Sequence, residues 1–241
     1  MGSEMCIRDS LKHIQATTDP SSSFYGQKGL NSLDCVLIDL FHAGSETTSS
    51  TMLWTILFLL HYPEVQNKVH EEIFKVVGSE RQPELQDMDQ MPYTKAVMQE
   101  SLRVGTVVPG GVPHYVEEDT WVGEYLFPKG TNVMSNLNYV HLNPEIWENP
   151  EHFNPDRFLD SEGLFLAHKA KIVPFSVGKR KCLGHALAEQ EYFLFLTGIL
   201  TKYRIENPEG QILPSFKFSE DTQNCGFVRY APKYLVKLVE K

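Results

Sequence analysis

The sequence predicts a mainly α-helical fold with small, separate β-sheets. Long stretches with apolar residues at helical spacing occupy most of residues 31–103. Short runs that resemble strands gather after Val104, and a last helical stretch precedes a strand-like C-terminus. Because helices and strands are grouped and do not alternate, a parallel sheet built from βαβ units is not expected.

The first thirty residues differ in texture from the rest. MGSEMCIRDS has no apolar run and leads into the serine-rich stretch TTDPSSSFYGQKG. Residues 1–30 are therefore expected to be a loose tail, either foreign at its extreme end or a native flexible N-terminus. The domain is expected to occupy residues 31–241.

The first expected helix is long. Apolar residues recur at helical spacing from Asn31, and the pattern continues through the polar stretch AGSETTSST into MLWTILFLL before it ends at HYP. A helix that is apolar on most sides at both ends is expected to lie in the core. The apolar run itself is too short to cross a bilayer.

Three further helices are expected along the chain. Pro63 suits the first turn of a helix that Gly78 ends, and Pro92 opens another that runs through Arg103. The last is expected over residues 183–200. The intervening stretch predicts short strands with a PKG turn between two of them, followed by an irregular meander rich in Asn-Pro pairs. Residues 226–241 predict a closing hairpin strand.

Composition excludes some classes of protein. The formal charge is −9, with 31 acidic and 22 basic residues, which argues against a general nucleic-acid partner. The four cysteines are scattered without a CxxC pair, which fits a reducing compartment and thiols that are buried or act as ligands. They are Cys6, Cys35, Cys182 and Cys225.

The segment FSVGKRKCLG surrounds Cys182 with features that favour a thiolate. The cations Lys179 to Lys181 precede the thiol, and a helix is expected to begin just after it. Gly178 supports a tight bend, and Gly184 leaves room for a flat, bulky group against the first turn of the helix. A lone thiolate beside such a group fits a haem iron ligand. A buried structural cysteine and a nucleophilic Cys–His enzyme are the alternatives.

Four motifs resemble those of the cytochromes P-450, the haem-thiolate monooxygenases, in the order of that family. FSVGKRKCLG resembles the cysteine-ligand signature, and AGSETT at 43–48 resembles the distal-helix motif. ESLR at 100–103 resembles the E-x-x-R motif, and NPDRF at 154–158 resembles the motif of the meander. The resemblance covers about residues 30 to 241, is similar in style to microsomal family-2-like members, and implies the C-terminal half of the cytochrome P-450 fold.

The resemblance implies a haem b whose iron takes its axial thiolate from Cys182. It implies proton delivery by Thr47 and Glu46, because cleaving the bond between the two oxygen atoms consumes two protons. It also implies further contacts with the haem, from Phe175 and Gly184 in the ligand loop, from Arg180 and His114 at the propionates, and from Ala43 and Gly44 beside the dioxygen site.

The resemblance also implies supporting residues away from the iron. Glu100, Arg103 and Arg157 resemble a structural network that fixes the meander behind the cysteine loop. Thr106 to Val112, and the turn at Cys225 to Phe227, are expected to line the substrate pocket.

By this resemblance the protein is a monooxygenase that inserts one atom of dioxygen into an apolar lipid, steroid or xenobiotic. Its electrons are expected from NADPH through a flavoprotein reductase, with cytochrome b5 as a second candidate donor. Lys179 to Lys181 are a candidate docking patch for such an acidic donor. The full-length parent is expected at the endoplasmic reticulum membrane, attached through an N-terminal half that this chain lacks.

Two other functions stay open. One is a haem-thiolate isomerase or dehydratase of lipid peroxides, which needs no reductase. Thr47 and Glu46 favour the monooxygenase, because rearrangement of a peroxide needs no proton relay. The other is a catalytically inactive fragment, because a chain without the helices that roof the pocket is expected to bind haem poorly.

Overall fold

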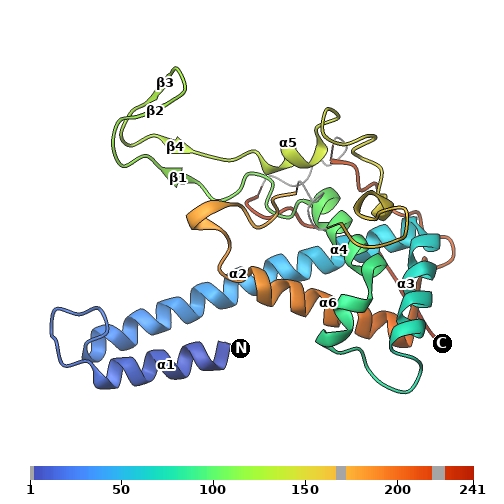
Figure 1. The fold of residues 1–241 in the computed structure, drawn as a ribbon, viewed down its shortest axis with the longest axis horizontal. Coiled ribbons are helices and arrows are strands. Elements are labelled where there is room, and N and C mark those ends of the chain that lie inside the picture. The colour runs from blue at the N-terminus through green and yellow to red at the C-terminus, as the bar shows by residue number, and fades with distance from the viewer. Residues whose placement is uncertain (1–2, 167–171, 219–225) are drawn as a thin grey trace.

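The computed structural model describes residues 3–166, 172–218 and 226–241 (Figure 1). Its helices are α1 (Ser3–Ala16), α2 (Gly26–His61), α3 (Pro63–Val76), α4 (Pro92–Gly105), α5 (Leu137–Leu142) and α6 (His185–Lys202). Short 3-10 turns are η1 (Leu85–Gln90), η2 (Pro155–Phe158) and η4 (Gly178–Arg180). The strands are β1 (His114–Tyr115), β2 (Thr120–Val122), β3 (Tyr125–Phe127), β4 (Asn132–Val133), β5 (Tyr203–Glu206) and β6 (Lys237–Glu240). The predicted mainly helical fold with small sheets is confirmed.

The core forms around the C-terminal half of α2, where α3, α4 and α6 pack against it (Figure 1). Leu57, Phe58 and Leu59 are fully buried. The Phe58 ring stacks on Trp54 and Phe153 at centroid distances of 5.9 and 4.7 Å. The apolar run of the sequence is therefore the centre of the hydrophobic core, because it supplies apolar side chains to every side of the helix.

The N-terminal half of α2 does not lie in the core, contrary to the expectation from its pattern. Val36, Ile38 and Phe41 are at least half exposed, because of the helices that the structure describes only α1 packs on this end. The accessible surface of 15296 Å² is large for a chain of 27.5 kDa, since compact monomers of this mass expose about 11,000 Å². No described helix combines the length and apolarity that a membrane span needs.

Residues 3–16 and 26–30 are helical, where the sequence predicted a loose tail. Ile7, Leu11 and Ile14 share one face of α1, and Ile14 is buried against the start of α2. Gly29 makes this approach possible, because a Cβ there would lie 3.0 Å from Ile14 Cγ1 and 2.5 Å from the Phe24 carbonyl oxygen. The apolar residues of α1 are too few for the sequence pattern alone to predict a helix, and the contact with α2 is visible only in the structure.

The segment from β1 to β4 forms a projecting arm that contains two separate two-stranded sheets (Figure 1). β1 pairs with β4, and β2 pairs with β3, both antiparallel. The tight hairpin turn lies at Gly123, whose φ of 60° suits glycine. The PKG sequence instead joins β3 to β4, which belong to different ladders.

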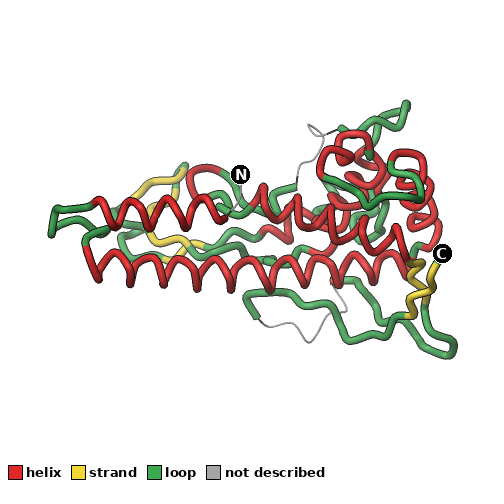
Figure 2. The backbone as a smooth tube through the Cα atoms, turned by 90° about the horizontal axis from the view of Figure 1, so that it is seen from below, coloured by secondary structure: helices red, strands yellow, loops and turns green. Residues whose placement is uncertain are grey.

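The C-terminal strand is shorter than expected and pairs across a long sequence separation. β6 covers only Lys237–Glu240 and pairs with β5, which directly follows α6. Figure 2 shows the strands at opposite ends of the molecule, with the arm at one end and this ladder at the other. Gln66 of α3 fastens β5, because its amide donates to the Ile205 carbonyl at 2.9 Å and accepts from the Ile205 N–H at 2.7 Å.

Replacing Gln66 by Met should lower the free energy of unfolding by about 2 to 4 kcal/mol, because both backbone groups of Ile205 would lose their buried partner. Urea denaturation followed by far-UV circular dichroism measures the change. The control is Asn67→Ala one position along α3, on an exposed site, which should shift stability by less than about 1 kcal/mol. Equal effects of the two substitutions would contradict the assignment.

Candidate functional site

The loop before α6 presents the thiol of Cys182 to solvent. The Cys182 N–H donates to the Phe175 carbonyl at 2.9 Å, and the Lys181 N–H donates to the Gly178 carbonyl at 3.2 Å. Gly178 has a φ of 72° and Ser176 a φ of 61°, so the chain turns back on itself between the two ends of the loop. The loop is thus held by backbone bonds and leaves the sulfur accessible.

The start of α6 lies directly beside the sulfur. The His185 N–H donates to the Cys182 carbonyl at 3.4 Å, and α6 begins at this residue, two positions after the predicted start. A Cβ at Gly184 would lie 4.0 Å from the sulfur, so the glycine keeps this side of the thiol open. The Phe175 ring contacts the His185 ring edge-on at 4.4 Å. These two rings line a hollow of about 320 Å³ together with Gln99 and Glu189.

The cations of the loop form an exposed face next to the thiol. Lys179 and Arg180 lie in η4, Lys181 follows them, and all three are exposed. Val177 and Leu183 are also strongly exposed on the same loop. The face therefore combines positive charge with apolar side chains.

Glu100, Arg103 and Arg157 come together behind this loop. Arg103 Nε donates to Glu100 Oε2 and its Nη2 donates to Oε1, both at 2.7 Å. Arg157 Nε donates to Glu100 Oε1 at 3.2 Å. The side chains of Glu100 and Arg103 are fully buried, which is tolerable only because each charge faces its partner and every polar atom is bonded.

The same ion pair holds the meander. Arg103 Nη1 donates to the carbonyls of His141 at 2.8 Å and Pro150 at 2.7 Å. Glu100 Oε1 accepts from the Asn154 N–H at 2.8 Å. The Arg103 guanidinium also lies 5.1 Å from the centroid of the Trp147 ring. The network thus fixes the end of α5 and the irregular chain between α5 and η2 against α4.

The residues of the distal-helix motif lie in the middle of α2, just before its buried stretch begins at Ser50. Ala43, Gly44 and Glu46 are exposed and Thr47 is half-buried. The Thr47 hydroxyl donates to the Ala43 carbonyl at 2.7 Å, so its oxygen keeps its lone pairs for another donor. The Tyr230 hydroxyl donates to Glu46 Oε2 at 3.0 Å, and this bond raises the pKa of Tyr230.

Other predicted site residues are spread over the surface. His114 is exposed on β1, where it faces Val133 across the ladder, and among the described residues no hydrogen bond joins it to Arg180. Phe227 is exposed, and Cys225 lies outside the described residues. The contact of His114 and Arg180 with a haem propionate stays a prediction.

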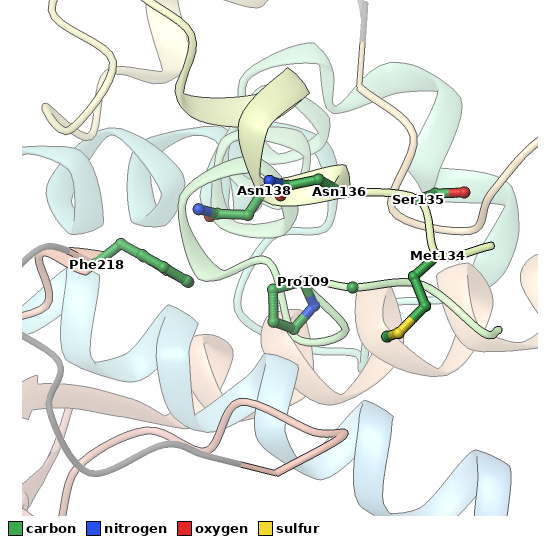
Figure 3. A pocket seen from close by; sticks show the side chains of 7 residues that line it. Pro109, Met134, Ser135, Asn136, Asn138 and Phe218 are labelled. Atoms are coloured by element: carbon green, nitrogen blue, oxygen red, sulfur yellow. The ribbon is translucent and has the colours of Figure 1, made fainter. Parts of the chain in front are cut away.

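Part of the expected substrate-lining stretch does border a hollow. Thr106 ends α4 with a φ of 36°, and Pro109 and Gly110 follow it. Pro109, Met134, Asn138 and Phe218 line a hollow of about 330 Å³. Figure 3 shows Phe218 on one side of it and Met134 on the other. Contact between substrate and residues 106–112 stays a prediction.

Sequence reasoning missed Arg229. Its guanidinium is buried, donates to the carbonyls of Val104 and Gly105 at 3.1 and 2.8 Å, and lies 4.1 Å from the Trp54 ring centroid. It therefore satisfies the last carbonyls of α4 at the negative end of the helix dipole. An arginine inside the apolar run GFVRY was the available signal. Its partners are backbone carbonyls, which every residue has, so the sequence does not indicate them.

Comparison with known proteins identifies the family of the chain. The family model described as Cytochrome P450 matches residues 25–238, and the chain belongs to that family. It is 42% identical over 212 residues to cytochrome P450 2J2 of Homo sapiens, covering 88% of this chain and 40% of that protein. It is 40% identical over 236 residues to steroid 17-alpha-hydroxylase/17,20 lyase of Gallus gallus, covering 96% of this chain and 45% of that protein. The chain thus spans less than half the length of these relatives.

The donor set of the loop fits a haem iron. A single accessible sulfur suits an axial site on a metal whose other ligands come from a porphyrin. Gly184 leaves space beside the sulfur, because a Cβ there would already lie 4.0 Å from it. Cys182 is the residue that would hold the iron.

Replacing Glu100 by Gln should lower the free energy of unfolding by about 3 to 5 kcal/mol, because the buried Arg103 would keep its charge without a counter-ion. Urea denaturation at neutral pH measures the loss. Glu64→Gln, at an exposed position at the start of α3, is the matched control and should have little effect. A loss no larger than that of the control would show that the network does not hold the meander.

Stability should fall below neutral pH in part through His141. Burial lowers the pKa of this imidazole from 6.5 to about 4, and the charge of Arg103 acts in the same direction. The unfolded chain therefore binds more protons between these values, so the stabilisation is complete above about pH 6.5 and is lost as the pH falls toward about 4.

Comparison of His141→Asn with the wild type isolates this contribution. Between about pH 7 and about pH 5 the wild type should lose roughly 2 kcal/mol more than the variant in urea denaturation. Burial also lowers the pKa of His70 to about 4, and that shift is common to both proteins. Equal losses in the two proteins would exclude His141 as a source of the acid sensitivity.

Proposed function

We propose that the protein is a haem-thiolate monooxygenase that inserts one atom of dioxygen into an apolar small molecule. The observation that carries the proposal is the loop that presents the accessible thiol of Cys182 beside the first turn of α6. Membership of the cytochrome P450 family supports it. Because the chain spans less than half of its relatives, the activity is proposed for the protein as a whole.

Each part of the proposed site has a distinct task. Haem, when bound, supplies the activation of dioxygen. Cys182 Sγ holds the iron from one face, and Gly184 keeps the approach to the sulfur open. Thr47 Oγ1 can accept a hydrogen bond while its own O–H donates to the Ala43 carbonyl. The exposed Glu46 carboxylate can collect protons from water and pass them along α2.

Electrons are proposed to come from NADPH through a flavoprotein reductase, with cytochrome b5 as a second donor. The exposed cations Lys179 to Lys181 lie next to the thiol and suit an acidic partner. Val177 and Leu183 add apolar surface at the same place. The endoplasmic reticulum membrane is the proposed location of the whole protein.

The proposed substrate is a lipid, a steroid or a xenobiotic. The exposed apolar side chains of Val36, Ile38 and Phe41 precede Thr47 along α2 and would suit an apolar molecule or further helices. One relative in Gallus gallus is named as a steroid hydroxylase, which supports a substrate of this kind.

A catalytically inactive fragment is the second candidate for the chain itself, and the exposed apolar half of α2 favours it. An isomerase or dehydratase of lipid peroxides is the third. Product formation with reductase and NADPH, compared with a lipid hydroperoxide alone, separates the two enzymatic candidates. Thr47 and Glu46 favour dependence on the reductase.

Reconstitution with haem tests the proposal. The ferrous protein with carbon monoxide should show the strongly red-shifted Soret band of thiolate-ligated haem, and Cys182→Ser should abolish it, because an alcohol does not replace the thiolate donor. Cys35→Ser is the matched control, since this thiol is also free and exposed but lies on α2, and the band should persist. A red-shifted band in Cys182→Ser would refute the assignment of the ligand.

A further inference from the structure

His141 is a fully buried side chain whose two ring nitrogens contact different parts of the fold. It lies in the last turn of α5. Nδ1 is 3.0 Å from the Thr106 hydroxyl at the end of α4, and Nε2 is 2.9 Å from the Val173 backbone nitrogen. Val173 stands two residues before Phe175, at the entrance to the cysteine loop. The imidazole therefore bridges the C-terminus of α4 and that entrance.

The hydrogen bonds determine the tautomer of His141. The Val173 N–H can only donate, so Nε2 must carry a lone pair. The proton is then on Nδ1, which donates to Thr106 Oγ1. The Thr106 hydroxyl donates in turn to the Arg103 carbonyl at 2.5 Å. Every donor in this chain has one acceptor, so the neutral imidazole is fully satisfied.

The backbone of His141 belongs to the ion-pair network. Its carbonyl accepts from Arg103 Nη1 at 2.8 Å. One residue thus contacts the buried arginine through its main chain and the loop entrance through its side chain. A displacement of α5 would move both contacts together.

The contact with Val173 extends into the loop through backbone bonds. The Val173 carbonyl accepts from the Ser176 N–H at 3.0 Å, which closes the turn where Ser176 has a φ of 61°. The Phe175 carbonyl, inside that turn, accepts from the Cys182 N–H at 2.9 Å. One turn and one further backbone bond therefore connect the imidazole to the residue that carries the thiol.

The contact with Thr106 stabilises a strained backbone. A φ of 36° is unfavourable for a β-branched residue. The hydroxyl of Thr106 is engaged on both sides, by His141 and by the Arg103 carbonyl. This residue sets the direction of the segment that continues through Pro109 and Gly110.

We propose that His141 is a positioning residue that fixes the entrance of the cysteine loop relative to the C-terminus of α4. Its contact with the loop is the hydrogen bond from the Val173 N–H to Nε2. The consequence for iron ligation rests on the proposed function of Cys182. Two measurements address these two parts separately.

Amide hydrogen exchange in the chain without haem tests the contact itself. His141→Gln places an acceptor near the position of Nε2, whereas His141→Asn keeps only a donor near the position of Nδ1. Exchange at the Val173 and Ser176 amides should be about tenfold faster or more in His141→Asn and within about threefold of the wild type in His141→Gln. Protection in the middle of α6 should stay unchanged and shows that each variant is folded.

His70 provides the matched controls. It is a half-buried histidine of α3 whose Nε2 has no partner among the described residues. His70→Asn and His70→Gln should leave exchange at Val173 unchanged. The proposal is overturned if His141→Asn and His141→Gln give equal exchange at Val173, or if the His70 variants accelerate it as much.

The spectrum of the haem-loaded protein tests the consequence for the ligand. In His141→Asn a larger share of the ferrous carbon monoxide complex should lack the red-shifted Soret band, and His141→Gln should restore it. Normal spectra in both variants would overturn the positioning role at the iron. Absence of the band in the wild type would instead count against the proposed function, while the exchange result would still decide the contact.

Discussion

The buried ion pair of Glu100 and Arg103 is the interaction on which the arrangement of the site depends. Neither side chain is exposed, so the network must satisfy both charges and the remaining donors of the guanidinium inside the protein. Carbonyls of His141, Pro150 and His152 accept from Arg103. The chain between α5 and η2 has little secondary structure of its own, and its position is therefore set by these bonds.

The C-terminus of α4 connects this ion pair to the other parts of the site. Arg103 lies in its last turn, and Thr106 ends it in a left-handed conformation. Arg229 covers the last carbonyls of the helix, and its own N–H donates to the Val107 carbonyl at 2.7 Å. The C-terminal segment, the meander and the cysteine loop therefore meet at one helix end, where unpaired backbone groups provide the acceptors.

The molecule has a packed end and an open end, and α2 belongs to both. Its C-terminal half is enclosed by aromatic and aliphatic side chains, whereas Val36, Ile38 and Phe41 face solvent. The family motif at 43–48 lies at the boundary between the two, where Ala43 to Glu46 are exposed and Thr47 is half-buried. The scaffold of the cysteine loop is consequently built from the packed end, independently of the surface that the distal motif presents.

The sequence by itself determined the helices that have strong periodicity or proline starts, and the loop around Cys182, because these depend on local spacing and on glycine and proline. The resemblance to the cytochromes P-450 added the network of Glu100, Arg103 and Arg157, because the two motifs that contain these residues are short and contiguous. Only the tertiary structure decided the pairing of α1 with α2, the burial of Arg229 and the two-sided role of His141. Each of these depends on a backbone carbonyl, a backbone amide or a weakly patterned face far away in the sequence, and such partners have no residue type by which they could be recognised.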